Sequence, residues 1–68
     1  MNQQPNIHLT PREQQILGLL LIRGSSNKEL GRMLGISEST VKLHMSRILK
    51  KYCAKTRTQL IIFAKGAV

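Results

Sequence analysis

The sequence predicts an all-α domain of four helices, and three observations support that fold class. Apolar residues recur every three or four positions, which is the spacing of helices with one face on a core. Ser or Thr stands three residues before Glu or Gln at three of the expected helix starts, a pattern typical of such starts. The 68 residues are enough for one domain, which we expect at residues 9–68 after a flexible lead over residues 1–8.

The first helix is expected over residues 11–23. Thr10 is the expected N-cap, and Glu13 completes a capping box, in which each side chain accepts a hydrogen bond from the other residue's backbone. The core-facing positions are Ile16, Leu17, Leu20 and Leu21. Gly24 is expected to end the helix, because glycine adopts the left-handed conformation of a C-terminal cap without steric cost.

A second, shorter helix is expected over residues 27–34, with Ser26 and Glu29 as its capping box. Gly31 lies inside this helix, where glycine costs about 1 kcal/mol relative to alanine. We therefore expect it to permit a close approach by the following helix, which a larger side chain would prevent. Gly35 is expected to form the next turn with positive φ, and the order helix, tight turn, helix is that of a helix-turn-helix.

The third helix is expected over residues 38–52, with Ser37 as its N-cap. One stripe is apolar and is expected to pack on the first two helices; it consists of Val41, Met45, Ile48, Leu49 and Tyr52. The opposite side is largely polar, basic or small, and it consists of Ser39, Lys42, Leu43, Ser46, Arg47 and Lys50. Such a face can enter the major groove of DNA without steric conflict.

The fourth helix is expected over residues 57–65, where Thr56 and Gln59 repeat the capping-box pattern. The core-facing positions are Leu60, Ile61 and Ala64. That assignment leaves Ile62 and Phe63 partly outward. Exposed apolar residues on a terminal helix favour a partner surface, although single apolar residues on a surface are also common.

The charge of the chain indicates a polyanionic partner. Eleven Lys and Arg residues stand against three acids, which leaves a formal net charge of +8. Each acid falls in the first turn of an expected helix, where a carboxylate favours the positive end of the helix dipole. Six of the basic residues and no acid lie within residues 42–57, namely Lys42, Arg47, Lys50, Lys51, Lys55 and Arg57.

The sequence predicts no enzyme, cofactor or metal site. Cys53 is the sole cysteine, so it has no disulfide partner within the chain and no companion ligand for a metal. His8 and His44 lack a neighbouring nucleophile or paired carboxylate, and we interpret His44 as a structural residue. No signal peptide or apolar run of membrane-spanning length is evident, so we expect a cytoplasmic protein without a membrane partner.

Four segments carry a family resemblance, and in chain order they are Leu9-Thr10-Pro11-Arg12-Glu13, Ser26-Asn27-Lys28-Glu29-Leu30, residues 36–44 and Thr56-Arg57-Thr58-Gln59. With these segments the chain resembles the LuxR-type helix-turn-helix, also called the NarL/FixJ or GerE type, over residues 9–65. The resemblance implies a bacterial, nucleoid-associated transcription regulator that binds DNA through four helices. It also implies that the third helix lies in the major groove and that the fourth forms the dimer contact.

The resemblance assigns DNA contacts by position. Base-edge contacts are implied for Lys42, Leu43 and Ser46. Backbone or flanking contacts are implied for Ser39, Thr40, Arg47 and Lys50, and an approach to a phosphate strand for Asn27 and Lys28. Lys42 can reach guanine O6 or N7 or a phosphate, and Leu43 can meet a thymine methyl group. From their charge, we expect Arg47, Lys50 and Lys51 to bind phosphates.

A homodimer through the fourth helix would set two recognition helices about 34 Å apart, which matches half-sites one DNA turn apart. RNA polymerase is a second candidate partner. Two alternatives share the helix-turn-helix pattern: a small module that modulates a larger regulator by protein contact, and a promoter-recognition domain like that of a sigma factor. Three features depart from the family pattern. Ser46 is shorter than its usual counterpart, the segment from Glu13 to Gly24 is one residue longer, and Cys53 stands where glycine or another turn former is common.

Overall fold

The computed structural model describes residues 7–66, and over that range the chain forms four helices and no strand. They are α1 (Pro11–Arg23), α2 (Asn27–Leu34), α3 (Glu38–Lys51) and α4 (Arg57–Ala64). This confirms the predicted all-α fold class. The expected ends of the last two helices are one residue too long, because Tyr52 and Lys65 are the capping residues that follow them. Residues 1–6 of the expected flexible lead lie outside the described range.

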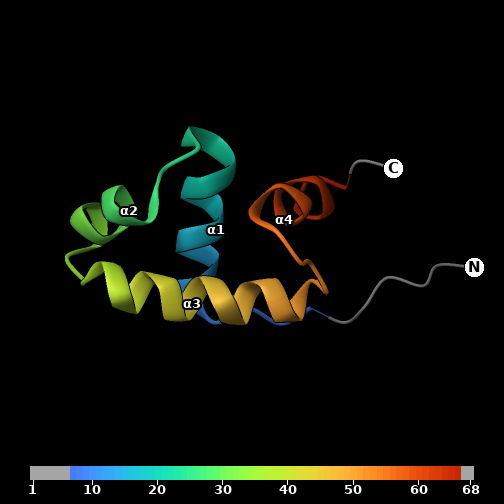
Figure 1. The fold of residues 1–68 in the computed structure, drawn as a ribbon, viewed down its shortest axis with the longest axis horizontal. Coiled ribbons are helices and arrows are strands. Elements are labelled where there is room, and N and C mark those ends of the chain that lie inside the picture. Colours follow the sequence, from blue (N-terminus) through green and yellow to red (C-terminus); the bar gives the residue numbers. More distant parts are fainter. Residues whose placement is uncertain (1–6, 67–68) are drawn as a thin grey trace, which may run out of the picture.

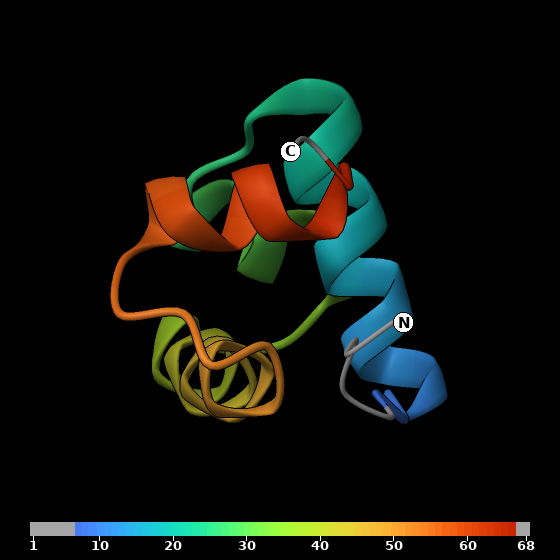
Figure 2. The ribbon, with the colours of Figure 1, turned by 90° about the vertical axis from the view of Figure 1, so that its right-hand side faces the viewer.

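The other helices are arranged along one side of α3 (Figure 1). α1 runs across α3, α2 lies near its N-terminal end, and α4 lies near its C-terminal end. α3 packs against both α1 and α2. Viewed along α3 in Figure 2, α4 lies above it and α1 lies to one side. One long side of α3 is therefore left uncovered by α2 and α4.

Side-chain caps begin all four helices, as the sequence predicts. A backbone N–H donates to the hydroxyl oxygen three residues earlier, at 3.1–3.2 Å, in the caps of Thr10, Ser26, Ser37 and Thr56. The reciprocal bond of a capping box is present at α1 and α2, where Glu13 and Glu29 accept from the N-cap backbone at 3.0 and 2.8 Å. Local sequence thus determines where these helices start.

The capping box expected at α4 is not formed. Gln59 Oε1 accepts a hydrogen bond from the backbone N–H of Lys55, at 2.7 Å, instead of from that of Thr56. Thr56 has a φ of −134°, whereas the N-caps of the two complete boxes have φ values of −67° and −76°. The different φ of Thr56 accompanies this change of hydrogen-bond partner.

Gly31 allows the turn between α2 and α3 to lie directly on α2. A Cβ atom at this position would lie 2.7 Å from the carbonyl oxygen of Ile36 and 3.4 Å from the backbone nitrogen of Glu38. The prediction of close approach is confirmed, with the backbone that leads into α3 as the approaching group. Gly35 adopts a φ of 70°, and Ile36 N donates to the Gly31 carbonyl at 2.9 Å.

A single aliphatic cluster joins the four helices. Each helix contributes to it, and its buried members among the described residues are Ile16, Leu17, Leu20, Leu30, Val41, Met45, Ile48 and Leu60. Burying one such side chain contributes about 1.5–3 kcal/mol relative to leaving it exposed. Three of these residues lie on α3, so the core fixes the rotation of α3 and thereby the direction in which its other side points.

Candidate nucleic-acid interface

The uncovered side of α3 carries the residues that the sequence assigns to DNA. Val41, Met45 and Ile48 are buried and hold α3 on the core. Successive residues of a helix are rotated by about 100°, so the opposite side faces solvent. The residues of that side are all exposed, and they are Ser39, Lys42, Leu43, Ser46, Arg47 and Lys50. We call this set the α3 face; its division from the core stripe is as predicted.

Lys42 and Leu43 occupy the first half of the α3 face. Lys42 Nζ lies 3.9 Å from Glu38 Oε2, with both side chains largely exposed. A surface ion pair of this kind is worth about 0–1 kcal/mol, so the ammonium can leave the carboxylate for a DNA atom at little cost. Leu43 is 51% exposed, so its side chain is accessible to a partner on the same side of α3 as Lys42.

Thr40 belongs to the cap of α3. Its backbone N–H donates to Ser37 Oγ at 3.1 Å, and its hydroxyl lies 2.9 Å from the same atom. The side chain is half-buried, whereas the neighbouring Ser39 is exposed. The structure therefore gives Thr40 a role in starting the helix, and it brings Ser39 onto the α3 face.

Lys51 does not lie on the α3 face, and its ammonium group is engaged within the protein, where a phosphate contact was expected. Lys51 Nζ donates to Glu13 Oε1 at 2.7 Å and to the backbone oxygen of His8 at 2.8 Å. The Glu13 side chain is 2% exposed and that of Lys51 is 35% exposed. The last turn of α3 lies against the first turn of α1, so the ammonium at this position is used to pair a buried carboxylate.

Glu13 remains ionised because Lys51 compensates for its burial. The hydrogen bond from Lys51 lowers the pKa of Glu13 below its ordinary value of 4.5, against the opposing effect of burial, and hydrogen bonds from Thr10 lower it further. Glu13 lies four residues before Leu17 and seven before Leu20, which places it on the buried stripe of α1. That spacing could have predicted the burial, and a buried carboxylate requires a cationic partner.

Arg57 is likewise directed into the protein. Its Nη1 donates to Asn27 Oδ1 at 2.9 Å, and its Nη2 donates to the backbone oxygen of Ser25. Sequence reasoning counted Arg57 among the clustered charges and missed this contact. Asn27 is half-buried beside it, and Lys28 is exposed. The backbone hydrogen bond from Ser26 holds the pKa of the neighbouring Glu29 below its ordinary value.

Four of the six basic residues within 42–57 remain exposed to solvent. They are Lys42, Arg47, Lys50 and Lys55. Three of these lie on the α3 face, and the fourth follows α3 in the link to α4. The candidate interface is therefore smaller and more local than the distribution of charge in the sequence indicates.

Ile62 and Phe63 are exposed on α4, as predicted. They are 44% and 46% exposed, while Leu60 of the same helix is fully buried. The exposed pair lies on the helix that Figure 1 shows at the far end of the molecule from α2. It forms an apolar surface separate from the α3 face.

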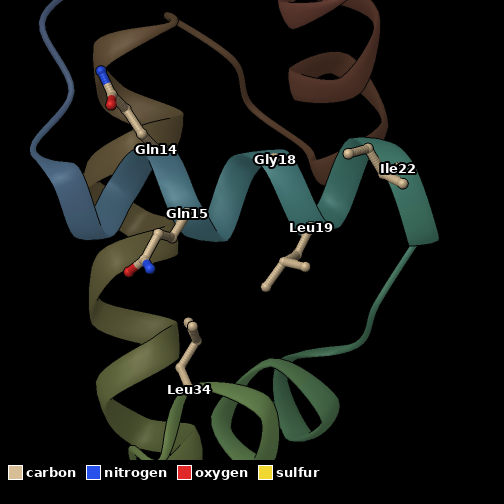
Figure 3. Close-up of a pocket in the computed structure, with 6 residues that line it drawn as sticks. All are labelled: Gln14, Gln15, Gly18, Leu19, Ile22 and Leu34. Atoms are coloured by element: carbon tan, nitrogen blue, oxygen red, sulfur yellow. The ribbon is translucent and has the colours of Figure 1, made fainter.

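A shallow groove of about 330 Å³ lies between α1 and α2 (Figure 3). It is lined by Gln14, Gln15, Gly18, Leu19 and Ile22 of α1 and by Leu34 of α2. None of these lining residues is titratable in the physiological range, so the groove contains no side chain for acid–base chemistry.

His44 is half-buried, and its Nδ1 atom is buried without a hydrogen-bond partner among the described residues. Residues 7–66 contain no group of three His, Cys, Asp or Glu residues that could hold a metal ion. None of the helices in the described part of the chain is long and apolar enough to cross a membrane.

Comparison with known families matches residues 8–64 to bacterial regulatory proteins of the luxR family. The CsgBAC operon transcriptional regulatory protein of Escherichia coli is 50% identical over 56 residues, which cover 82% of this chain and 26% of that protein. The nitrate/nitrite response regulator protein NarL of Escherichia coli is 46% identical over 55 residues, which cover 81% of this chain and 25% of NarL. The transcriptional regulatory protein LiaR of Bacillus subtilis is 43% identical over 63 residues, covering 93% of this chain and 29% of LiaR. The chain thus spans about a quarter of the length of these relatives.

Proposed function

The chain belongs to the luxR family of bacterial regulatory proteins, and we propose that it binds double-stranded DNA sequence-specifically to regulate transcription, with α3 in the major groove. The observation that carries this proposal is the α3 face, an exposed basic surface on a helix whose other side is locked to the core. A helix held in this way presents its outer side chains with a fixed rotation, which base recognition requires.

Base contacts are assigned to Lys42, Leu43 and Ser46. The Lys42 ammonium can donate to guanine O6 and N7, and exposed Leu43 can contact a thymine methyl group. Ser46 lies one turn after Lys42, where its small side chain keeps α3 close to the groove floor. These three residues make up the proposed specificity set.

Phosphate contacts are assigned to Ser39, Arg47 and Lys50 on α3 and to Asn27 and Lys28 on α2. Such contacts set affinity and register without reading bases. Each phosphate that a cation neutralises changes the slope of log affinity against log salt by about −0.9. Binding is therefore expected to weaken steeply as salt rises, and a flat salt dependence would contradict these assignments.

A homodimer through α4 is the proposed assembly, with Ile62 and Phe63 as its contact. Two copies would read half-sites whose centres are about 34 Å apart. Analytical ultracentrifugation of a double variant, Ile62→Glu with Phe63→Glu, tests this assembly. Association equal to that of the wild type would exclude this surface as the dimer contact.

The proposed function is tested by selecting bound sequences from a random duplex pool and then measuring Lys42→Ala on the selected and a random duplex. Lys42→Ala is expected to lose most of the discrimination between the two, because one good base contact is worth about 1–3 kcal/mol. Lys50→Ala is the control, since removing a phosphate ligand weakens binding to both duplexes alike. A wild-type chain that enriches no sequence would instead favour the protein-interaction alternative.

A further inference from the structure

Arg57 joins the starts of two helices that are far apart in the sequence. It is the first residue of α4, and Asn27, which accepts its Nη1–H at 2.9 Å, is the first residue of α2. The second amino group of Arg57 donates to the backbone oxygen of Ser25, which is 4% exposed. Figure 2 shows the first turn of α4 beside the segment that leads from α1 into α2.

The bond from Arg57 determines how the Asn27 carboxamide is oriented. A guanidinium has only donors, so Asn27 must turn its acceptor oxygen towards Arg57. The NH₂ group of the same carboxamide then points away from the guanidinium and is left to donate elsewhere. Phosphate oxygens only accept hydrogen bonds, so this orientation leaves Asn27 with the group that a DNA backbone contact needs.

The same guanidinium connects α4 to the start of α2, where Asn27 and Lys28 are proposed to contact phosphates. Arg57 fixes Ser25 and Asn27, the residues that flank the N-cap Ser26. α4 also carries Ile62 and Phe63, the surface proposed for dimerisation. The contacts of Arg57 with Ser25 and Asn27 therefore join the helix that carries the dimer surface to the start of α2.

We propose that Arg57 is a positioning residue of the DNA interface, which orients Asn27 as a phosphate donor and ties the start of α2 to α4 without contacting DNA itself. This inference rests on the proposed DNA-binding function. It reverses the role that the charge of Arg57 indicates, because the residue contributes to affinity through geometry and not through counterion release.

The first test compares Arg57→Met with Arg47→Met, its matched control on the α3 face. Binding to a short random-sequence duplex is measured by fluorescence anisotropy from about 50 to 200 mM salt. Arg57→Met is expected to weaken binding about 2- to 10-fold at every salt concentration, the loss expected for one hydrogen bond. Its salt slope stays that of the wild type, because neutral Asn27 releases no counterion. Arg47→Met is expected to flatten the slope by about 0.9 for each phosphate that the side chain neutralised.

A flattened slope for Arg57→Met would show that Arg57 binds phosphate directly and would overturn the proposal. If the wild type binds DNA and Arg57→Met binds it equally well, the proposal is overturned as well, while the proposed function is left intact. A wild-type chain that binds no duplex would overturn the proposed function itself. Circular dichroism at the binding temperature establishes that each variant is folded.

Substitutions of Asn27 separate positioning from a purely structural role. Asn27→Asp keeps an acceptor for Arg57 but replaces the NH₂ donor by a negatively charged oxygen, so the melting temperature is expected to be retained while DNA affinity falls. Asn27→Ala combined with Arg57→Met is expected to bind DNA no more weakly than Asn27→Ala alone, because Arg57 acts through Asn27. Fully additive losses, or wild-type DNA affinity in Asn27→Asp, would contradict the inference.

Discussion

Lys50 and Lys51 are neighbours in the last turn of α3, yet they lie in different surroundings. Lys50 is exposed on the α3 face, whereas Lys51 donates to Glu13 and to the His8 backbone. A rotation of about 100° per residue is enough to turn one ammonium towards solvent and the next towards α1. The same contrast separates exposed Arg47 from Arg57. A count of charges thus indicates the class of partner, but the fold decides which charges can meet it.

The largest expected effect is the loss of stability in Lys51→Met. Removing one partner of a buried ion pair costs about 3–5 kcal/mol, and partial exposure of Lys51 reduces that to about 2–3 kcal/mol. Urea unfolding measures the change, with Lys50→Met as the matched control, expected to stay within about 0.5 kcal/mol of the wild type. If the two variants are equally stable, the ion pair of Lys51 with Glu13 does not stabilise the fold.

Acid should destabilise the wild type more than Glu13→Gln. The pKa of Glu13 is lowered in the folded chain, so the unfolded chain takes up a proton more readily. The stabilisation is therefore complete above the ordinary pKa of 4.5 and is lost as pH falls through the folded-state value. Thermal melts from about pH 6 to pH 3 measure the effect. Parallel curves for the two proteins would show that Glu13 and Lys51 contribute no pH-dependent stability.

A smaller effect is expected for DNA binding by Lys50→Met. If Lys50 neutralises a phosphate, its removal flattens the slope of log affinity against log salt by about 0.9. Measurements on a random duplex suffice, since phosphate contacts carry no sequence information. If Lys50→Met has normal stability and the same salt slope as the wild type, Lys50 does not bind a phosphate.

The smallest effect on stability is expected for Cys53→Gly, at the turn that follows α3. Cys53 has a φ of 55°, and Ala54 N closes the helix end by donating to the Leu49 carbonyl at 2.9 Å. A left-handed conformation costs an L-residue about 1–2 kcal/mol, and the greater entropy of unfolded glycine cancels part of the gain. Cys53→Gly is expected to stabilise the chain by about 0.5–1 kcal/mol without changing DNA affinity. Destabilisation would mean that the Cys53 side chain makes a contact of its own.

The helix starts could be predicted because their causes lie within three or four residues. Thr10, Ser26, Ser37 and Thr56 each cap a helix as expected. The close approach at Gly31 was equally predictable, since a glycine inside a helix requires a packing reason. The exception at Gln59 shows the limit of this approach, because the residue pattern is that of a capping box and yet the side chain accepts from the N–H of Lys55.

The roles of Lys51 and Arg57 could not be predicted in the same way, because their partners lie 38 and 30 residues away along the chain. Both were assigned from charge and local clustering alone. Helix periodicity predicted the composition of the α3 face correctly, since the core stripe of α3 fixes its opposite side. It did not show that the last turn of α3 ends against α1.

The most direct test of the central claim is an NMR titration that observes the lysine side-chain ammonium groups while a selected duplex is added. The account predicts that the Lys42 and Lys50 signals shift on binding, because these ammonium groups exchange water for DNA acceptors. The Lys51 signal is expected to stay in place, held by Glu13 at 2.7 Å. A Lys51 signal that shifts as far as that of Lys50 would contradict the separation of binding charges from structural charges.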